Sequence, residues 1–185
     1  MASEANGRAV RSPWRIIGWG VAVALLIAPF VAMQFTRDVN WTAWDFMLFG
    51  FMLLAVGVPL ELAARYAHDR PYVAGAALAL LGAFLVTWAN LAVGIVGSEH
   101  SPSNMLFFVV LLASIGAAAV SRFRSLAMSR AMIGTALGVT VAFGIAASLP
   151  TDEPQVSHLR EFAGTSIFAA LFLLSAWFFR RAARA

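Results

Sequence analysis

Residues 72–96 read YVAGAALALLGAFLVTWANLAVGIV, a run of 25 residues without one charged side chain. A helix needs about 20 predominantly apolar residues to cross the hydrocarbon core of a bilayer. Five comparable runs occur in the rest of the chain, separated by short polar gaps. We therefore predict six transmembrane helices, at about residues 14–33, 44–65, 72–96, 104–121, 128–149 and 162–179.

The composition supports this interpretation. Of the 185 residues, 61% are hydrophobic and only 12% are charged. One soluble core cannot bury that much apolar surface, so the surplus must face lipid. The sequence predicts an all-α, polytopic membrane bundle that forms a single transmembrane domain over residues 1–185, with no separate soluble domain.

The arginines indicate the orientation of the chain. All thirteen basic residues are arginines, and eleven of them fall in alternate gaps between the apolar runs. These eleven are Arg8, Arg11, Arg15, Arg65, Arg70, Arg122, Arg124, Arg130, Arg180, Arg181 and Arg184. Because basic residues collect in cytoplasmic loops, we predict that both termini lie in the cytoplasm. The basic inner surface is expected to attract anionic lipid headgroups rather than nucleic acid.

Several functional classes are disfavoured by what the sequence lacks. Without lysine the chain cannot form a retinal Schiff base or a phosphate-binding P-loop, and without cysteine it has no thiolate metal site. Its three histidines fall in predicted loops, so no histidine pair is placed to hold haem inside the bundle. We expect no cofactor and favour a protein that is not an enzyme. The loop residues His100 and His158 are candidate metal ligands, but solvated loop charge is the commoner explanation for such residues.

Asp45, Asn90 and Glu99 are candidate binding residues near the predicted outer face. Asp45 begins the second apolar run, where it could instead cap the helix together with Thr42. Asn90 carries an amide into an apolar helix and needs a hydrogen-bond partner there. We predict that Asp45, Asn90 and Glu99 converge, with a cation, a proton, Arg37 or Arg160 offsetting the two carboxylates.

Glu61 is the one ionisable residue well inside an apolar run. Intramembrane carboxylates are candidates for proton or cation sites. Arg65 follows four residues later, so an ordinary ion pair within one helix explains Glu61 equally well. Both interpretations remain open from the sequence.

Small residues predict where helices pack, because close approach of backbones drives helix association in lipid. The fifth run carries Gly134, Gly138 and Ala142 at spacings of four, and the third carries Gly94 and Gly97. We expect these two sets to form packing faces within the bundle, with homo-oligomerisation as the alternative.

The segments 40–46, 88–99, 102–104 and 128–131 resemble a group of small uncharacterised bacterial inner-membrane proteins. The most specific part is Asn-Leu-Ala-Val-Gly-Ile, starting at Asn90, followed by Gly-Ser-Glu ending at Glu99. The resemblance covers about residues 20–145. It implies a location in the bacterial cytoplasmic membrane and directs attention to Asp45, Asn90 and Glu99, without assigning an activity.

Two functions from different classes follow. The first is a non-catalytic accessory or interaction subunit that packs in the bilayer against a membrane partner or against itself. The second is a small transporter or channel for a proton, a cation or a small polar solute, using Glu61 and the Asp45, Asn90 and Glu99 cluster.

Overall fold

The computed structural model describes residues 13–67, 69–98, 100–149 and 158–184. Its helices are α1 (Pro13–Ala32), α2 (Ala43–Tyr66), α3 (Arg70–Ala92), α4 (Met105–Val120), α5 (Ser125–Ser148) and α6 (His158–Ala182), and a 3₁₀ turn, η1 (Pro102–Asn104), precedes α4. Each of these six helices is long and apolar enough to cross a membrane. The predicted all-α class and the six candidate spans are confirmed.

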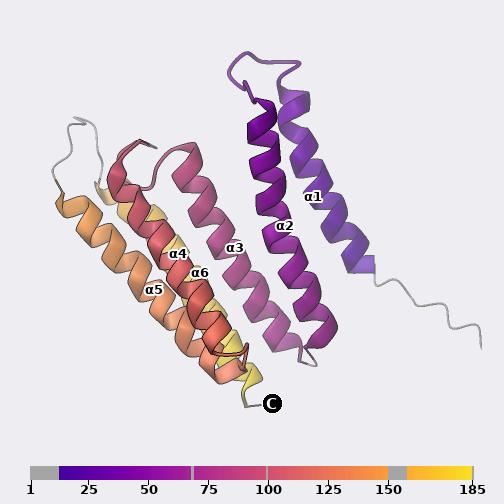
Figure 1. Ribbon diagram of the computed structural model, residues 1–185, viewed down its shortest axis with the longest axis vertical. Helices are drawn as coiled ribbons and strands as arrows, with labels where there is room; N and C mark the ends of the chain where they lie inside the picture. Colours follow the sequence, from indigo (N-terminus) through magenta and orange to yellow (C-terminus); the bar gives the residue numbers. More distant parts are fainter. Residues whose placement is uncertain (1–12, 68, 99, 150–157, 185) are drawn as a thin grey trace, which may run out of the picture. The chain divides into compact units, whose positions relative to one another are not determined.

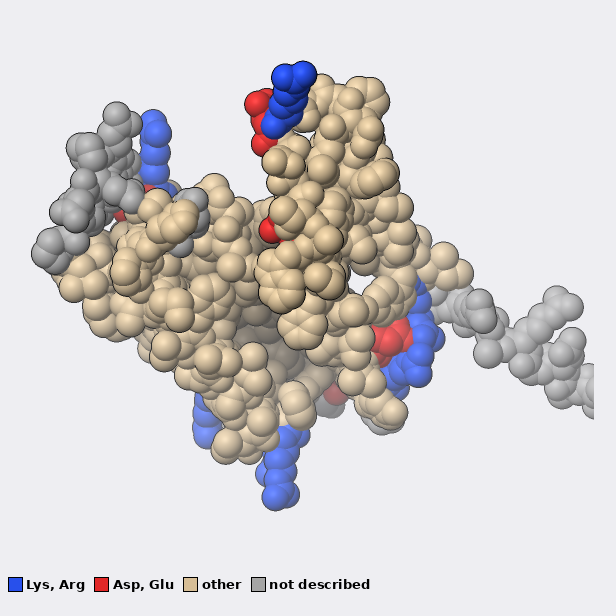
Figure 2. All heavy atoms as spheres, turned by 45° about the horizontal axis from the view of Figure 1, so that its top comes forward, with Lys and Arg blue, Asp and Glu red and all other residues tan. Residues whose placement is uncertain are grey.

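The helices carry apolar side chains on their exposed faces as well as on the faces that pack together. Every helix exposes large hydrophobic side chains, among them Phe51, Leu112 and Leu173. Figure 2 shows broad surfaces without charge, and most of the charged groups lie toward the ends of helices. Surfaces of this kind are stable against hydrocarbon, and the chain is accordingly a multi-pass membrane protein in contact with lipid.

The chain divides into two compact units, residues 1–61 and residues 62–185. In the first unit, α1 and α2 form an antiparallel hairpin (Figure 1). Leu26 of α1 contacts Gly50, and the ring of Trp19 lies 3.0–3.4 Å from the point where a Cβ on Gly57 would stand. The contacts advance seven residues on each helix, as expected for two helices that run in opposite directions.

The second unit is built around α6. The last helix packs against both α3 and α5, while α4 packs against α5 and touches α3 only slightly. The fully buried side chains of this core come from all four helices and from the loop before α4, and include Val86, Val96, Phe107, Val139, Phe172 and Phe179. The final helix is therefore part of the core and not an addition at the edge.

Two glycines allow α3 and α6 to approach closely. The ring of Phe179 covers Gly75 and the ring of Phe172 covers Gly82, and a Cβ at either glycine would stand 3.1 Å from ring carbon. The repeat is seven residues on both helices, which is the period of knobs-into-holes packing. Beside it, Ser175 donates a hydrogen bond of 2.7 Å to the carbonyl of Gly75.

The packing faces predicted from sequence are partly wrong. Gly138 does contact Val110 of α4, since a Cβ there would stand 2.9 Å from Val110 Cγ1, and Ala142 is buried. Gly134, however, faces open space. Gly94 and Gly97 lie beyond the end of α3 rather than on its face.

The helix α3 ends at Ala92, four residues before the predicted boundary at 96. Gly94 and Gly97 adopt φ angles of 76° and 70°, a left-handed conformation that glycine enters without steric cost. The backbone therefore leaves the helix and folds into a loop that begins with residues 93–98. This loop forms the end of the second unit at which the candidate site lies.

Candidate functional site

Asn104 organises the loop between α3 and α4. Its Oδ1 accepts hydrogen bonds from the backbone N–H groups of Ile95 (3.2 Å) and Val96 (3.0 Å), and its Nδ2 donates to the Ser98 carbonyl at 2.8 Å. The Asn104 side chain is buried. One amide thus satisfies three backbone groups that the end of α3 leaves without helical partners, and it holds Ile95 and Val96 in the core.

Glu161 ties α6 to the same loop. It lies in the first turn of α6, and its Oε1 accepts a hydrogen bond of 2.9 Å from the Gly97 N–H. A carboxylate in this position also faces the positive end of the helix dipole. The sequence did not single out Asn104 or Glu161, although Asn104 belongs to the Pro-Ser-Asn segment of the resemblance.

Asn90 points into the second unit and not toward lipid. Its side chain is 3% exposed, and its Nδ2 donates to the Val86 carbonyl of the same helix at 3.1 Å. Its Oδ1 is buried and has no hydrogen-bond partner. The partner that the amide was expected to need is thus present for its nitrogen, within the same helix, and absent for its oxygen.

Thr165 of α6 has the same property as Asn90. It is 3% exposed, and its Oγ1 is buried without a partner. Because Phe172 lies over Gly82, one further heptad along the two antiparallel helices brings position 165 opposite position 89. The two unpartnered oxygens therefore belong to the same layer of the α3–α6 interface.

The other threonines show that this state of Thr165 is not general. Thr87, Thr135 and Thr140 each donate to the carbonyl four residues earlier, at 2.9–3.0 Å. That bond is the usual way in which a helical hydroxyl is satisfied in an apolar environment. Thr165 does not make this bond. Its hydroxyl oxygen therefore stays buried in the interface without a hydrogen bond, which costs free energy.

Asp45 forms a capping arrangement with Thr42 at the start of α2. Its Oδ2 accepts hydrogen bonds from the Thr42 N–H (2.7 Å) and hydroxyl (2.8 Å), and the Asp45 N–H points back to Thr42 Oγ1 at 3.4 Å. This reciprocal pattern is a capping box. It is the helix-capping alternative that the sequence offered, and it accounts for Asp45 without a ligand.

Glu61 forms an ion pair with Arg15 of α1, and the Arg15 Nε donates to Glu61 Oε2 at 2.9 Å. The Glu61 side chain is 13% exposed and that of Arg15 36% exposed. The sequence pointed to Arg65 and missed Arg15, which lies 46 residues away. A basic residue at the start of the preceding antiparallel helix was the signal that could have identified it.

The predicted convergence of Asp45, Asn90 and Glu99 stays a prediction. Asp45 belongs to the first unit and Asn90 to the second, and Glu99 lies outside the described residues. Of the candidate metal ligands, His100 is exposed and the side chain of His158 is outside the described part. Within the part of the chain that the structure describes, no group of three or more histidine or acidic side chains could hold a metal ion.

Comparison with known proteins assigns neither a family nor a function to the chain. No protein-family model, no curated protein and no solved structure matches the chain.

Proposed function

We propose that this protein is a non-catalytic accessory subunit that lies in a membrane. There it packs within the bilayer against a partner protein or against a second copy of itself. One observation carries the proposal: each described carboxylate within a candidate span is engaged by a group of the chain itself. Asp45 is bonded to Thr42, Glu61 to Arg15 and Glu161 to the Gly97 N–H.

These contacts bear on transport because a translocated proton or cation needs a carboxylate that it can occupy. A carboxylate whose charge is already offset by a guanidinium or by N–H and O–H donors attracts a proton or cation less strongly than a free one. Instead, Asp45 stabilises a helix end, Glu61 the α1–α2 hairpin and Glu161 the loop after α3. Acidic residues used in this way support a structural role of the protein.

The location and orientation are part of the same proposal. The protein lies in the bacterial cytoplasmic membrane, like the group that its sequence resembles, with both termini in the cytoplasm. Support comes from seven arginines at one end of α3 to α6, which we call the arginine-rich end: Arg70, Arg122, Arg124, Arg130, Arg180, Arg181 and Arg184. Under the positive-inside rule this end faces the cytoplasm and its anionic headgroups.

Purification in a mild detergent, followed by mass spectrometry of co-purifying proteins, tests the accessory role. We expect a reproducible partner or a homo-oligomer, and no proton or alkali-cation flux above background in proteoliposomes. Glu61→Gln and Asp45→Asn should leave flux at background while changing helix stability or partner recovery. Flux that is abolished by either substitution would refute the accessory proposal.

The second candidate, a small transporter or channel, is favoured by one observation only. Asn90 Oδ1 and Thr165 Oγ1 are two buried polar atoms without partners in one layer of the second unit. A path for a polar solute would need such atoms. Flux in proteoliposomes that falls in both Asn90→Leu and Thr165→Val would favour this candidate over the first.

A further inference from the structure

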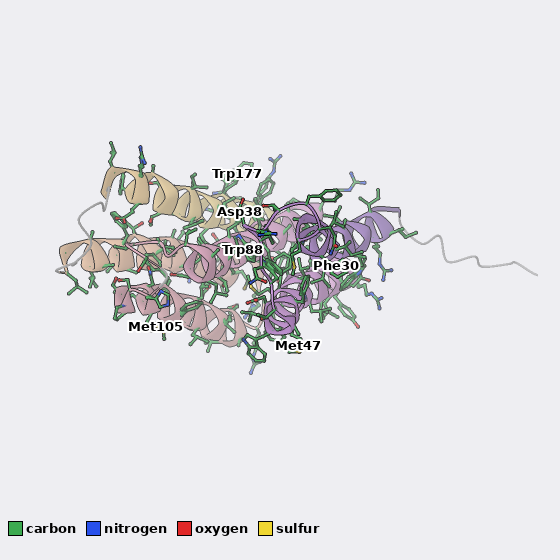
Figure 3. The ribbon with its side chains drawn as sticks, turned by 90° about the horizontal axis from the view of Figure 1, so that it is seen from above. Phe30, Asp38, Met47, Trp88, Met105 and Trp177 are labelled. Carbon is green, nitrogen blue, oxygen red and sulfur yellow. The ribbon has the colours of Figure 1, made fainter. Side chains whose placement is uncertain are left out.

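The end of α6 carries a basic groove that the helix packing does not use. Trp177, Arg180, Arg181 and Arg184 line a groove of about 210 Å³. Trp177, Arg180 and Arg181 are spaced by three and four residues and so lie on one face of α6, while Arg184 lies just beyond the last helical residue, Ala182. Trp177 is about half exposed and projects from the outer side of α6 (Figure 3).

Among the residues that the structure describes, the guanidinium groups of this groove have no anionic partner. The Arg181 guanidinium carbon lies 5.4 Å from the centre of the Trp177 ring, a cation–π contact that leaves its N–H edge available. No described carboxylate lies within ion-pair distance of Arg180, Arg181 or Arg184. Arginines in a last helical turn do favour the negative end of the helix dipole, but Arg184 lies beyond the end of α6.

We infer that this groove binds the phosphate of an anionic glycerophospholipid. Guanidinium groups bind phosphate through paired, charge-assisted hydrogen bonds, and tryptophan settles at the depth of the headgroups. The groove is smaller than the roughly 300–1,000 Å³ sites that hold drug-sized ligands, so it suits a headgroup rather than a whole organic molecule.

The adjacent surface indicates a lipid rather than a soluble phosphate. Leu173 and Leu174, one turn nearer the middle of the span, are 49% and 45% exposed. An acyl chain leaving a headgroup in the groove can therefore run along α6 over these residues. The inference deepens the proposed attraction of the arginine-rich end to anionic headgroups by naming the place where one headgroup binds.

The test compares two variants that remove the same number of charges from the same end. R180Q/R181Q/R184Q removes the groove, and R122Q/R124Q/R130Q removes three exposed arginines of the α4–α5 turn and of α5. Native mass spectrometry of the delipidated full chain measures the binding of phosphatidylglycerol, diluted in uncharged detergent micelles that present no charged surface. Phosphatidylcholine and inorganic phosphate serve as the other two probes.

We expect the groove variant to bind phosphatidylglycerol about tenfold more weakly or worse, corresponding to about 1.4 kcal/mol. The R122Q/R124Q/R130Q variant should lose much less affinity for phosphatidylglycerol. Phosphatidylcholine should bind the unsubstituted protein more weakly than phosphatidylglycerol does, and millimolar inorganic phosphate should not displace phosphatidylglycerol. Equal losses in the two variants would overturn the groove and leave only a diffuse attraction of the whole end. Competition by inorganic phosphate would overturn the assignment to lipid.

A folding control keeps the result interpretable. Helical circular dichroism and a monodisperse elution profile must match those of the unsubstituted protein. If the triple variant does not fold, R184Q alone replaces it, because Arg184 follows the last helical residue, Ala182. Unchanged phosphatidylglycerol binding in R184Q would then count against the groove.

Discussion

The two units of the molecule hold their helices together in different ways. No described residue of α1 is buried, and its hairpin with α2 depends on an aromatic ring over Gly57, a leucine against Gly50 and the Arg15–Glu61 ion pair. In the second unit α5 alone buries nine residues, and a continuous core joins α3 to α6. The candidate spans of the two units have similar mean hydropathy, 2.0–2.1 in the first and 1.8–2.1 in the second, so hydrophobicity does not distinguish them.

The difference shows what stabilises helices in lipid. Lipid tails are as apolar as leucine, so association depends on close packing and on polar contacts between helices. Both units have contacting glycines seven residues apart, Gly50 and Gly57 in the first and Gly75 and Gly82 in the second. Only the second unit surrounds them with a continuous buried core, so a single charge pair carries a larger share of the stability of the first unit.

The largest expected effect concerns the orientation of the helices in the two units, because a fused reporter gives an all-or-none signal: it lies either outside or inside the membrane. Fusions at residues 36, 100 and 155 should report outside, and fusions at 68, 125 and 185 inside, since the arginines lie in the alternate gaps. Alkaline phosphatase and green fluorescent protein fusions measure this. A reversal at 36 alone would show that α1 and α2 do not cross as a hairpin, whereas a reversal at 100 and 125 would break the topology of the second unit.

Asn104→Ala should give the largest loss of stability in the second unit. It leaves the Ile95 and Val96 N–H groups and the Ser98 carbonyl without partners, and each such buried group costs about 1–3 kcal/mol. Hydrogen exchange should show loss of protection at these two amides. Asn104→Asp is the control, because it keeps an oxygen that accepts from the Ile95 and Val96 N–H groups. Equal exchange rates of these two N–H groups in both variants would refute the role of the Oδ1 atom.

Gly82→Leu tests the close packing of the second unit. The new side chain must displace the Phe172 ring, and overpacking of a core costs about 1–3 kcal/mol, occasionally more. Unfolding in a detergent titration measures the loss. Gly134→Leu, which enters open space, should be nearly neutral, and Phe172→Ala combined with Gly82→Leu should recover part of the stability. Equal effects at Gly82 and Gly134 would contradict the packing argument.

Arg15→Ala should destabilise the hairpin of the first unit by about 1–2 kcal/mol, because it leaves the Glu61 carboxylate in an apolar span. The cost is below that of a fully buried pair, since Arg15 is about one third exposed and partly screened. Protease accessibility of the hairpin measures it, with Arg37→Ala as the control. Recovery in Arg15→Glu with Glu61→Arg would confirm the pair, and no recovery would argue against it.

The smallest effect is expected at the polar layer of the second unit. Because the unpartnered Asn90 and Thr165 oxygens lie in one layer, we expect Asn90→Leu and Thr165→Val to be non-additive by roughly 0.6 kcal/mol, the average for polar contacts between helices in membranes. A double-mutant cycle measures the coupling. Strict additivity would show that the two buried oxygens act independently.

Sequence patterns predicted the helices well and their ends less well. Apolar length and polar gaps located the six helices, because in hydrocarbon a backbone can satisfy its polar groups only by forming a continuous helix. The end of α3 was misplaced because Val93 to Val96 are as apolar as the helix before them. What ends the helix is Gly94 in a left-handed conformation and a side chain ten residues later, Asn104.

The sequence by itself determined that this is a membrane protein and located the six helices of its described residues, since both follow from composition and length in a solvent without water. Only the tertiary structure decided which polar groups meet. Arg15 and Glu61 are 46 residues apart, Gly97 and Glu161 are 64 apart, and Ser175 and Gly75 are 100 apart. Such pairs depend on the register and order of packed helices, which put α6 between α3 and α5, and no local pattern encodes that choice.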